Sequence, residues 1–257
     1  MNDKERRIFL LDYLLREGGY EYKIPTEEVA QKNLLRALMN VRLPSPLSAE
    51  FIKIQDEYLK NETLKKGITA IEDLSPVYGD IYLWQGDITT IECDAIVNAA
   101  NSQMLGCFQP LHNCIDNCIH SAAGLQLRNY CNDLMLAQGK QEPTGKAKIT
   151  PAFNLPCRYV IHTVGPIVCG TLKKRDKTLL ADCYENCLKI AEENNLKSIA
   201  FCCISTGVFG FPQQAAAKLA VKTVNDYKNI SGSDIKVIFN VFKDTDLEIY
   251  KKLLFNE

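Results

Sequence analysis

Three potential metal ligands follow directly after a short apolar run in the middle of the chain. Residues 95–97 (Ala-Ile-Val) are typical of a buried strand. Cys107, His112 and Cys114 come next in the spacing C-x4-H-x-C, and residues 115–124 then carry apolar side chains at helical spacing. A strand, a loop with metal-type ligands and a helix together predict an open α/β fold, because sites in such folds lie where strands lead into helices.

The donor set of this loop suits zinc. Two thiols and one imidazole make a soft site, and three protein ligands leave the fourth tetrahedral position free for water or substrate, as in catalytic zinc sites. Two alternatives stay open at this point. The cysteines can be small core residues, because the chain has 11 of them and cysteine is among the most buried residue types. A fourth ligand such as Cys118 or His120 would instead close the site into a structural one.

Composition argues against several classes of protein. The formal net charge is -1, so the chain lacks the basic surface of a general nucleic-acid binder. No apolar run approaches the roughly 18 residues of a membrane span. The first residues do not resemble a signal peptide, and the odd number of cysteines, 11, indicates reduced thiols. We therefore expect a cytoplasmic protein, with a mitochondrial address as the alternative.

The first 70 residues predict an extension of three amphipathic helices. The first covers residues 3–17 and ends at a Gly-Gly pair, the second begins after an N-cap at Thr26, and the third begins after Ser48 and ends at Gly67. Their apolar stripes need burial. We therefore expect this helical extension to pack on the main domain, with a partner-docking arm as the alternative.

From about Asp80 the pattern changes to strands alternating with helices, which predicts a sheet with helices on both faces in a main domain of residues 71–257. Residues 140–148 are expected to form a polar loop. The predicted strands are 81–84, 95–98, 157–164, 198–204 and 235–241, and the predicted helices are 116–124, 125–137, 178–193 and 213–227.

Several sequence blocks together resemble the macrodomain family, α/β modules that bind ADP-ribose. They follow one another in the family's order, and a Tyr-Val-Ile-His-Thr-Val-Gly-Pro run at 159–166 fits the same family. Where common macrodomain hydrolases have a run of glycines, this chain has the potential metal ligands. That departure resembles the zinc-dependent subclass, which acts as protein ADP-ribosylhydrolases. The four main blocks are Gly-Asp-Ile-Thr at 86–89, Val-Asn-Ala-Ala-Asn at 97–101, Ile-Asp-x-x-Ile-His-x-Ala-Ala-Gly at 115–124 and Ile-Ser-Thr-Gly-Val-Phe-Gly-Phe-Pro at 204–212.

The resemblance implies a fold and a set of functional residues. The fold is a macrodomain-type three-layer α/β/α mixed sheet over residues 71–257, preceded by the helical extension of residues 1–70. One Zn²⁺ per chain would be bound by Cys107, His112 and Cys114. The implied catalytic residues are Asp116 and Asn101. The implied substrate-binding residues are Asp87, Ile88, Asn101, Cys114, Ile115, Asp116, Ser205, Thr206, Gly207, Val208 and Phe209.

The expected reaction is hydrolysis of mono-ADP-ribose from acidic side chains of target proteins. Asp116 would position or deprotonate water, and Asn101 would hold the distal ribose, with Asn98 as an assistant. Zinc would either lower the pKa of bound water or polarise an oxygen. The family is also associated with lipoyl-carrier proteins as targets and with a partner sirtuin that adds the modification. Alternatives are a reader that binds ADP-ribose without cleaving it, a deacetylase of O-acetyl-ADP-ribose, and a zinc-stabilised scaffold.

The resemblance also gives roles to residues outside the loop that carries the potential metal ligands (residues 105–114, the metal loop). Each of these roles has a structural alternative. Asp87 would accept from the adenine amine, or it caps a short helix. The glycine-containing run at 205–211 would cradle the diphosphate at a helix entrance, and its Phe209 would cover the distal ribose or anchor the loop. Phe242 could stack on adenine or pack at the rim. His162, inside an apolar run, is expected to be a core histidine.

Overall fold

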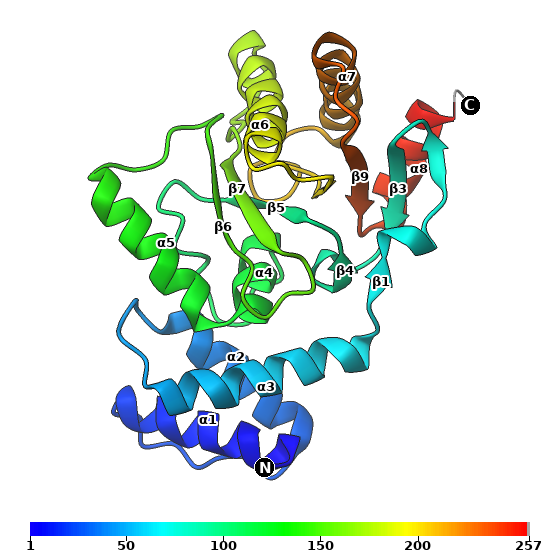
Figure 1. The fold of residues 1–257 in the computed structure, drawn as a ribbon. Helices are drawn as coiled ribbons and strands as arrows, with labels where there is room; N and C mark the ends of the chain where they lie inside the picture. Colours follow the sequence, from blue (N-terminus) through cyan, green and yellow to red (C-terminus); the bar gives the residue numbers. More distant parts are fainter. Residues whose placement is uncertain (256–257) are drawn as a thin grey trace.

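Residues 1–255 are described by a computed structural model, in which a helical block precedes an α/β unit (Figure 1). The helices are α1 (Asp3–Glu17), α2 (Glu28–Val41), α3 (Ala49–Lys66), α4 (Ile115–Ala123), α5 (Leu125–Gln138), α6 (Lys174–Glu193), α7 (Gln213–Ser231) and α8 (Asp244–Leu254), with short 3-10 turns η1 (Ile71–Asp73) and η2 (Ile88–Thr90). The strands are β1 (Thr69–Ala70), β2 (Pro76–Tyr78), β3 (Ile81–Gln85), β4 (Ile91–Glu92), β5 (Ala95–Ala100), β6 (Ala147–Pro151), β7 (Tyr159–Val164), β8 (Ser198–Phe201) and β9 (Lys236–Val241).

The main sheet has seven strands in the order β2-β3-β9-β8-β5-β7-β6. Its five inner strands run parallel, and the two outer strands, β2 and β6, are antiparallel to their neighbours. Helices α6, α7 and α8 pack on one face, and α4 and α5 cover the other (Figure 1). The predicted three-layer mixed sheet is confirmed. None of the helices formed by residues 1–255 has the length and apolar character that a membrane span requires.

The apolar runs of the sequence became the inner strands of this sheet. Ala95, Ile96 and Val97 of β5 are fully buried, as are Val160 and Ile161 of β7. Parallel strands with helices on both faces are buried on both sides, so they carry continuous rather than alternating apolar residues. This burial fixes β5 in the middle of the sheet and thereby places the loop that follows it.

The topology opens a crevice between the ends of β5 and β8. From β5 the chain moves to β7 on one side, and later returns to β8 on the other side of β5. The pairing of β5 with β8 covers only Ala95↔Ile199 and Ile96↔Ala200, so the two strands separate beyond these residues. Ligands of open α/β sheets bind at such a switch point, outside the carboxyl ends of the strands.

The helical extension packs against the α4–α5 layer (Figure 1). It has an apolar core of its own, centred on side chains such as Leu10, Leu11 and Phe51, and Leu125 of α5 belongs to the same core. Polar contacts reinforce the junction, since Asp56 Oδ1 accepts from Asn154 Nδ2 and from Gln126 Nε2, each at 2.8 Å. The apolar stripes of the extension are therefore covered in the structure.

Helix ends in the extension were predicted with one error. Ser48 Oγ accepts from Phe51 N at 3.1 Å and caps α3, as expected. Thr26 is not the cap of α2: the helix begins at Glu28 after Glu27, which makes no side-chain cap bond. Thr26 lies before this cap, and its carbonyl accepts from Gln31 Nε2 at 3.4 Å.

Several element boundaries in the α/β unit also differ from the sequence prediction, and one helix was not predicted. The strand predicted for 198–204 ends at Phe201, because the chain turns there toward Ser205, whose φ is 65°. Helix α6 begins at Lys174, four residues before the predicted start at 178. The polar loop expected at 140–148 is shorter, since β6 begins at Ala147, and α8 was not predicted.

Candidate functional site

The three predicted metal ligands lie together after β5. The donor atoms of Cys107, His112 and Cys114 all lie within 4.8 Å of one another, and all three residues are half-buried. Cys107 Sγ is 3.5 Å from His112 Nδ1. Zinc bonds of about 2.3 Å to sulfur and about 2.0 Å to nitrogen place tetrahedral ligand atoms at roughly this separation. The donor set and its spacing therefore fit one zinc ion.

The structure also bears on the two residues considered as a fourth ligand. Within residues 1–255, the group of close donor atoms around Cys107 does not include Cys118 or His120. His120 instead lies with Cys131 and His162 in a separate buried group. The metal loop thus offers three protein ligands, which leaves one position of a tetrahedral ion open.

Asn117 connects the metal loop to helix α4. Cys114 is the N-cap of α4, and its Sγ accepts from Asn117 N at 3.4 Å. The buried Asn117 side chain donates from Nδ2 to the carbonyls of Cys107, at 3.2 Å, and Gln109, at 3.0 Å. One residue therefore connects both ends of the loop, through its side chain to Cys107 and Gln109 and through its main-chain N–H to Cys114. The sequence analysis did not identify this role.

Asp116 lies in the first turn of α4 with its carboxylate held by two amides. Oδ1 accepts from Asn98 Nδ2 at 2.8 Å, and Oδ2 accepts from Asn101 Nδ2 at 3.2 Å. Burial raises the pKa of the Asp116 carboxyl to about 6, against the opposing effects of the Asn98 bond, the charge of Arg128 and the Asn101 bond. A carboxyl with a pKa near neutrality can accept and return a proton at physiological pH.

Asn98 joins Asp116 to the buried His162. Its Nδ2 is 3.1 Å from His162 Nδ1, and His162 Nε2 is 3.0 Å from Thr150 Oγ1. Burial lowers the pKa of His162 to about 3, so the ring is neutral. His162 is therefore a core histidine with partners on both nitrogens, as predicted. Asn98 Oδ1 is buried and has no partner among residues 1–255, which leaves an acceptor beside Asp116.

Asn101 uses its amide within the protein. Besides Asp116, its Nδ2 donates to the carbonyl of Gly106 at 3.0 Å, and its Oδ1 accepts from Gln103 N at 2.9 Å. The side chain thus fixes the turn after β5 and the start of the metal loop. In this arrangement Asn101 orients the Asp116 carboxylate, and a contact to ribose would require its amide hydrogens to change partners.

Asp87 follows β3, and its carboxylate contacts Thr89, through N and Oγ1, and Lys66. Its Oδ1 accepts from Thr89 N at 3.0 Å and caps η2, the alternative considered from sequence, while Oδ2 lies 3.0 Å from Lys66 Nζ. Burial acts to raise its pKa, but the Thr89 bonds and the charge of Lys66 hold the pKa below its usual range. The side chain stays 38% exposed. A charged acceptor therefore remains accessible at this position. The adjacent Ile88 is buried.

The loop after β8 presents unused backbone donors. Within residues 1–255, the N–H groups of Gly207, Val208 and Phe209 have no acceptor. Ser205, at a φ of 65°, has a buried hydroxyl without a partner. The carbonyl of Phe209 accepts from Val168 N at 2.8 Å, which secures the loop. Successive free N–H groups before a helix are suited to binding an anion.

These segments lie at the same edge of the sheet. Strands β3, β9, β8 and β5 are neighbours in the sheet and all run parallel. Asp87, the 205–211 loop and the metal loop therefore follow the carboxyl ends of β3, β8 and β5. Ile115 opens α4 at the same edge. Phe242 follows β9 at this edge. It is 74% exposed, so it is not packed in the core. The predicted site residues thus lie along one edge of the sheet, at the carboxyl ends of its strands.

Comparison with known proteins agrees with this architecture. Residues 97–220 match the family described as Macro domain. A Protein-ADP-ribose hydrolase of Treponema medium is 59% identical over 260 residues, covering 99% of this chain and 100% of the relative. The chain belongs to the macrodomain family. A Protein-ADP-ribose hydrolase of Staphylococcus aureus (strain MSSA476) is 51% identical over 98% of this chain and 96% of the relative.

A solved structure shares the fold of this macrodomain. The Trypanosoma brucei macrodomain in complex with ADP-ribose is 30% identical, with a TM-score of 0.66, and the match covers 82% of this chain and 93% of that chain. The crevice at the β5/β8 switch point is thus found in a fold with a solved ADP-ribose complex.

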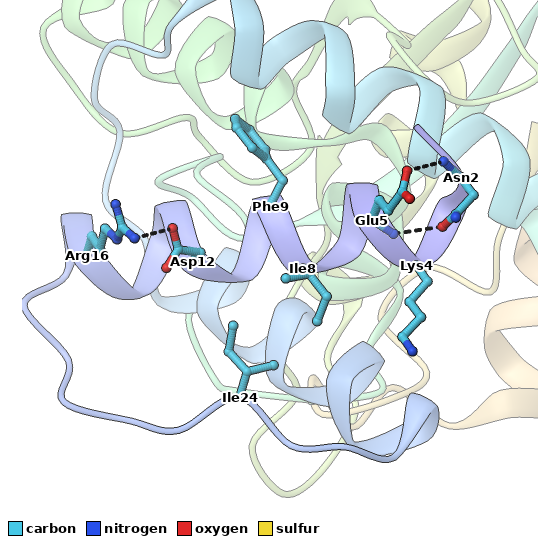
Figure 2. Close-up of a pocket in the computed structure, with 8 residues that line it drawn as sticks. All are labelled: Asn2, Lys4, Glu5, Ile8, Phe9, Asp12, Arg16 and Ile24. Carbon is cyan, nitrogen blue, oxygen red and sulfur yellow. Dashed lines mark hydrogen bonds and ion pairs between the residues drawn. The ribbon is translucent and has the colours of Figure 1, made fainter.

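A hollow away from the sheet lies on the helical extension. It has a volume of about 780 Å³ and is lined by α1 and the segment leading to α2 (Figure 2). Three of its charged groups already have partners: Glu5 bonds Asn2 in a capping box, and Arg16 pairs with Asp12 at 3.0 Å. The hollow therefore lacks the converging polar groups of the crevice, and we do not place the site there.

Gly106 allows the metal loop to pass close to helix α4. Its φ is 79°, and a Cβ would lie 2.8 Å from His120 Cγ. We expect Gly106→Ala to cost the αL penalty of about 1–2 kcal/mol and a further ~1–3 kcal/mol from overpacking. The free energy of unfolding, measured in urea, tests this. Gly139→Ala is the matched control, because Gly139 has a φ of 69° and no atom near its Cβ position. Equal losses in both variants would contradict the close approach.

Proposed function

We propose that this macrodomain is a zinc-dependent protein ADP-ribosylhydrolase that removes mono-ADP-ribose from acidic side chains of target proteins. One observation carries the proposal: the buried Asp116 carboxylate, held by Asn98 and Asn101, comes two residues after the last ligand of a three-donor metal group. The hydrolase names of the Treponema and Staphylococcus relatives support the reaction class.

The carboxyl edge of the sheet would bind ADP-ribose. The exposed part of the Asp87 carboxylate is suited to accept from the adenine amine, and the free N–H groups of 207–209 are suited to the diphosphate. This would leave the distal ribose toward the end of β5, beside Asp116. The solved complex of the Trypanosoma macrodomain with ADP-ribose supports this choice of ligand.

Zinc is the metal that the loop would hold through Cys107, His112 and Cys114. When bound, it supplies Lewis-acid activation of an oxygen at the reacting centre. The two thiolates would balance the charge of the Zn²⁺ ion, which makes it a weaker Lewis acid. Orienting the substrate would therefore be a large part of the contribution of zinc. The half-buried position of all three ligands gives the open coordination position access to a substrate.

The chain's own residues can supply the proton transfer. Asp116, with its pKa raised to about 6, would orient a water molecule and take its proton as the water oxygen bonds to the distal ribose carbon and the bond from that carbon to the side-chain carboxylate breaks. Asn98 and Asn101 would keep the carboxylate in place. The products are ADP-ribose and a free side-chain carboxylate, a good leaving group that requires only modest activation.

The central test combines metal content with activity. The protein is purified without chelator, its zinc is quantified, and release of ADP-ribose from acidic side chains is followed before and after removing the metal. We expect about one zinc per chain and metal-dependent release. Zinc with ADP-ribose binding but no release from any linkage would make the protein a reader. Cleavage of O-acetyl-ADP-ribose alone would make it a deacetylase. The first substrates that we propose for this assay are lipoyl-carrier proteins modified by a partner sirtuin in the cytoplasm.

Replacing Asp87 is expected to weaken ADP-ribose binding. A hydrogen bond to a charged group contributes about 1.5–3 kcal/mol, so Asp87→Ala should raise the dissociation constant roughly 10- to 100-fold, as measured by calorimetry. Asp87→Asn keeps the acceptor for Thr89 N and removes the charge, so it separates the adenine contact from the η2 cap. An unaltered affinity in both variants would refute the adenine role.

A further inference from the structure

Helix α2 of the extension binds the backbone of the metal loop. Arg36 Nη2 donates to the carbonyl of His112 at 2.6 Å and to Asn117 Oδ1 at 2.9 Å, and Nη1 is 3.4 Å from Asn113 Oδ1. One guanidinium thus contacts the main chain of a metal ligand and the residue that connects both ends of the loop. The planar guanidinium of arginine has several N–H donors in fixed directions, so it can bind neighbouring oxygen atoms at the same time.

Asn40, one turn after Arg36, makes a second connection. Its Oδ1 accepts from Leu111 N at 3.0 Å, and its Nδ2 donates to Ser121 Oγ of α4 at 2.9 Å. Asn40 is only 1% exposed. Leu111 has a φ of 58°, a left-handed conformation that is costly for a residue with a branched side chain and persists only when neighbouring groups fix it. Two contacts fix it: the bond from Leu111 N to Asn40, and the bond from His112 N to the Gln109 carbonyl at 3.3 Å, which closes the turn.

Arg128 of α5 holds the end of α2 in place from the other side. Its Nη1 donates to the carbonyls of Met39, Asn40 and Arg42, at 2.9, 3.0 and 2.6 Å. Its Nε donates to the carbonyl of Leu105, at the start of the metal loop, at 2.8 Å. The last carbonyls of a helix otherwise lack partners. The C-terminus of α2 and the beginning of the loop are therefore bound to one side chain.

We propose that α2 is a built-in clamp for the metal loop, in which Arg36 and Asn40 are positioning residues that set the geometry of residues 107–114 for zinc. The inference rests on the proposed zinc function and gives the extension a role in the site. Neither residue touches the metal or the substrate; they act through the His112 carbonyl and the Leu111 amide. Partners of this kind change metal affinity by about 10- to 100-fold when they are removed. The alternative role of the extension, as a docking arm, would require a free α2 face, whereas this face is bound to the loop.

The test compares Arg36→Ala with Arg42→Ala in the full chain. Arg42 is the matched control, because its guanidinium binds Glu17 and the carbonyls of Ser45 and Pro46, all within the extension. Zinc affinity is measured by competition with a chromophoric chelator, and hydrogen exchange of loop amides 105–113 is measured on the same samples. We expect Arg36→Ala to bind zinc about tenfold or more weakly with faster exchange in the loop, and Arg42→Ala to keep both values.

Zinc affinity and loop exchange that stay at wild-type values in Arg36→Ala would overturn the clamp. A fall of equal size in Arg42→Ala would also overturn it, because the effect would then come from general weakening of the extension. If Arg36→Ala does not fold, Arg36→Lys provides the same comparison, since lysine keeps the positive charge but lacks the planar set of guanidinium donors. A wild-type protein that binds no zinc would refute the proposed metal function, and loop exchange in the variants would still decide whether α2 holds the loop.

Discussion

Replacing Asp116 by alanine is expected to lower turnover by about 10²- to 10⁴-fold, the usual contribution of a positioned general base, while ADP-ribose binding is retained. The buried carboxylate is the acceptor at the end of β5, and both of its oxygens are oriented by amides from that strand and its turn. Its removal takes away the proton acceptor and leaves Asp87 and the 205–211 loop unchanged. Single-turnover release of ADP-ribose and calorimetric binding measure the two effects separately.

Asp133→Ala is a suitable control for this experiment, because Asp133 is an exposed carboxylate on the neighbouring helix α5. It should turn over at the wild-type rate. Turnover that is unchanged in Asp116→Ala would remove Asp116 from the mechanism. A loss of ADP-ribose affinity as large as the loss of turnover would make Asp116 a binding residue instead of a base.

The inner strands could be predicted from sequence because burial on two faces gives continuous apolar runs. The predicted strand at 95–98 and the structural β5 share a start at Ala95, and β3 begins at Ile81 as predicted. Edge strand β6 was missed, because it is partly exposed along its length and ends in Pro151, which edge strands tolerate. The predicted strand 198–204 extends past the end of β8 at Phe201. Cys202 and Ile204 are apolar and buried like strand residues, although they lie outside the sheet.

The candidate site was predictable only where its residues are close in the chain. Cys107, His112 and Cys114 lie within eight residues, so their spacing alone showed a potential metal group. Arg36 contacts the loop across 76 residues of sequence at His112, and Arg128 reaches back to Asn40 across 88. No local pattern marks such contacts, since each depends on how the extension packs on α4 and α5.

Removal of one predicted metal ligand is the second change with a large expected effect. Cys107→Ala should lose stoichiometric zinc, with affinity lowered by more than about 100-fold, because loss of a direct ligand costs more than loss of the partners that orient it. Two donors, His112 and Cys114, would remain in the group. Elemental analysis of the purified variant gives the metal content, and release of ADP-ribose should fall with it. Stoichiometric zinc in Cys107→Ala would refute the ligand assignment.

Cys118→Ala is the matched control, and it also decides what kind of metal site this is. Cys118 is half-buried on α4 one turn after Cys114, and its Sγ lies 3.8 Å from Arg36 Nη2 rather than in the three-donor group. We expect the variant to retain zinc and activity. Zinc loss equal to that of Cys107→Ala would mean that four protein ligands close the site. A closed site has no open position for substrate, so zinc would then stabilise the loop, and Asp116 would have to act without it.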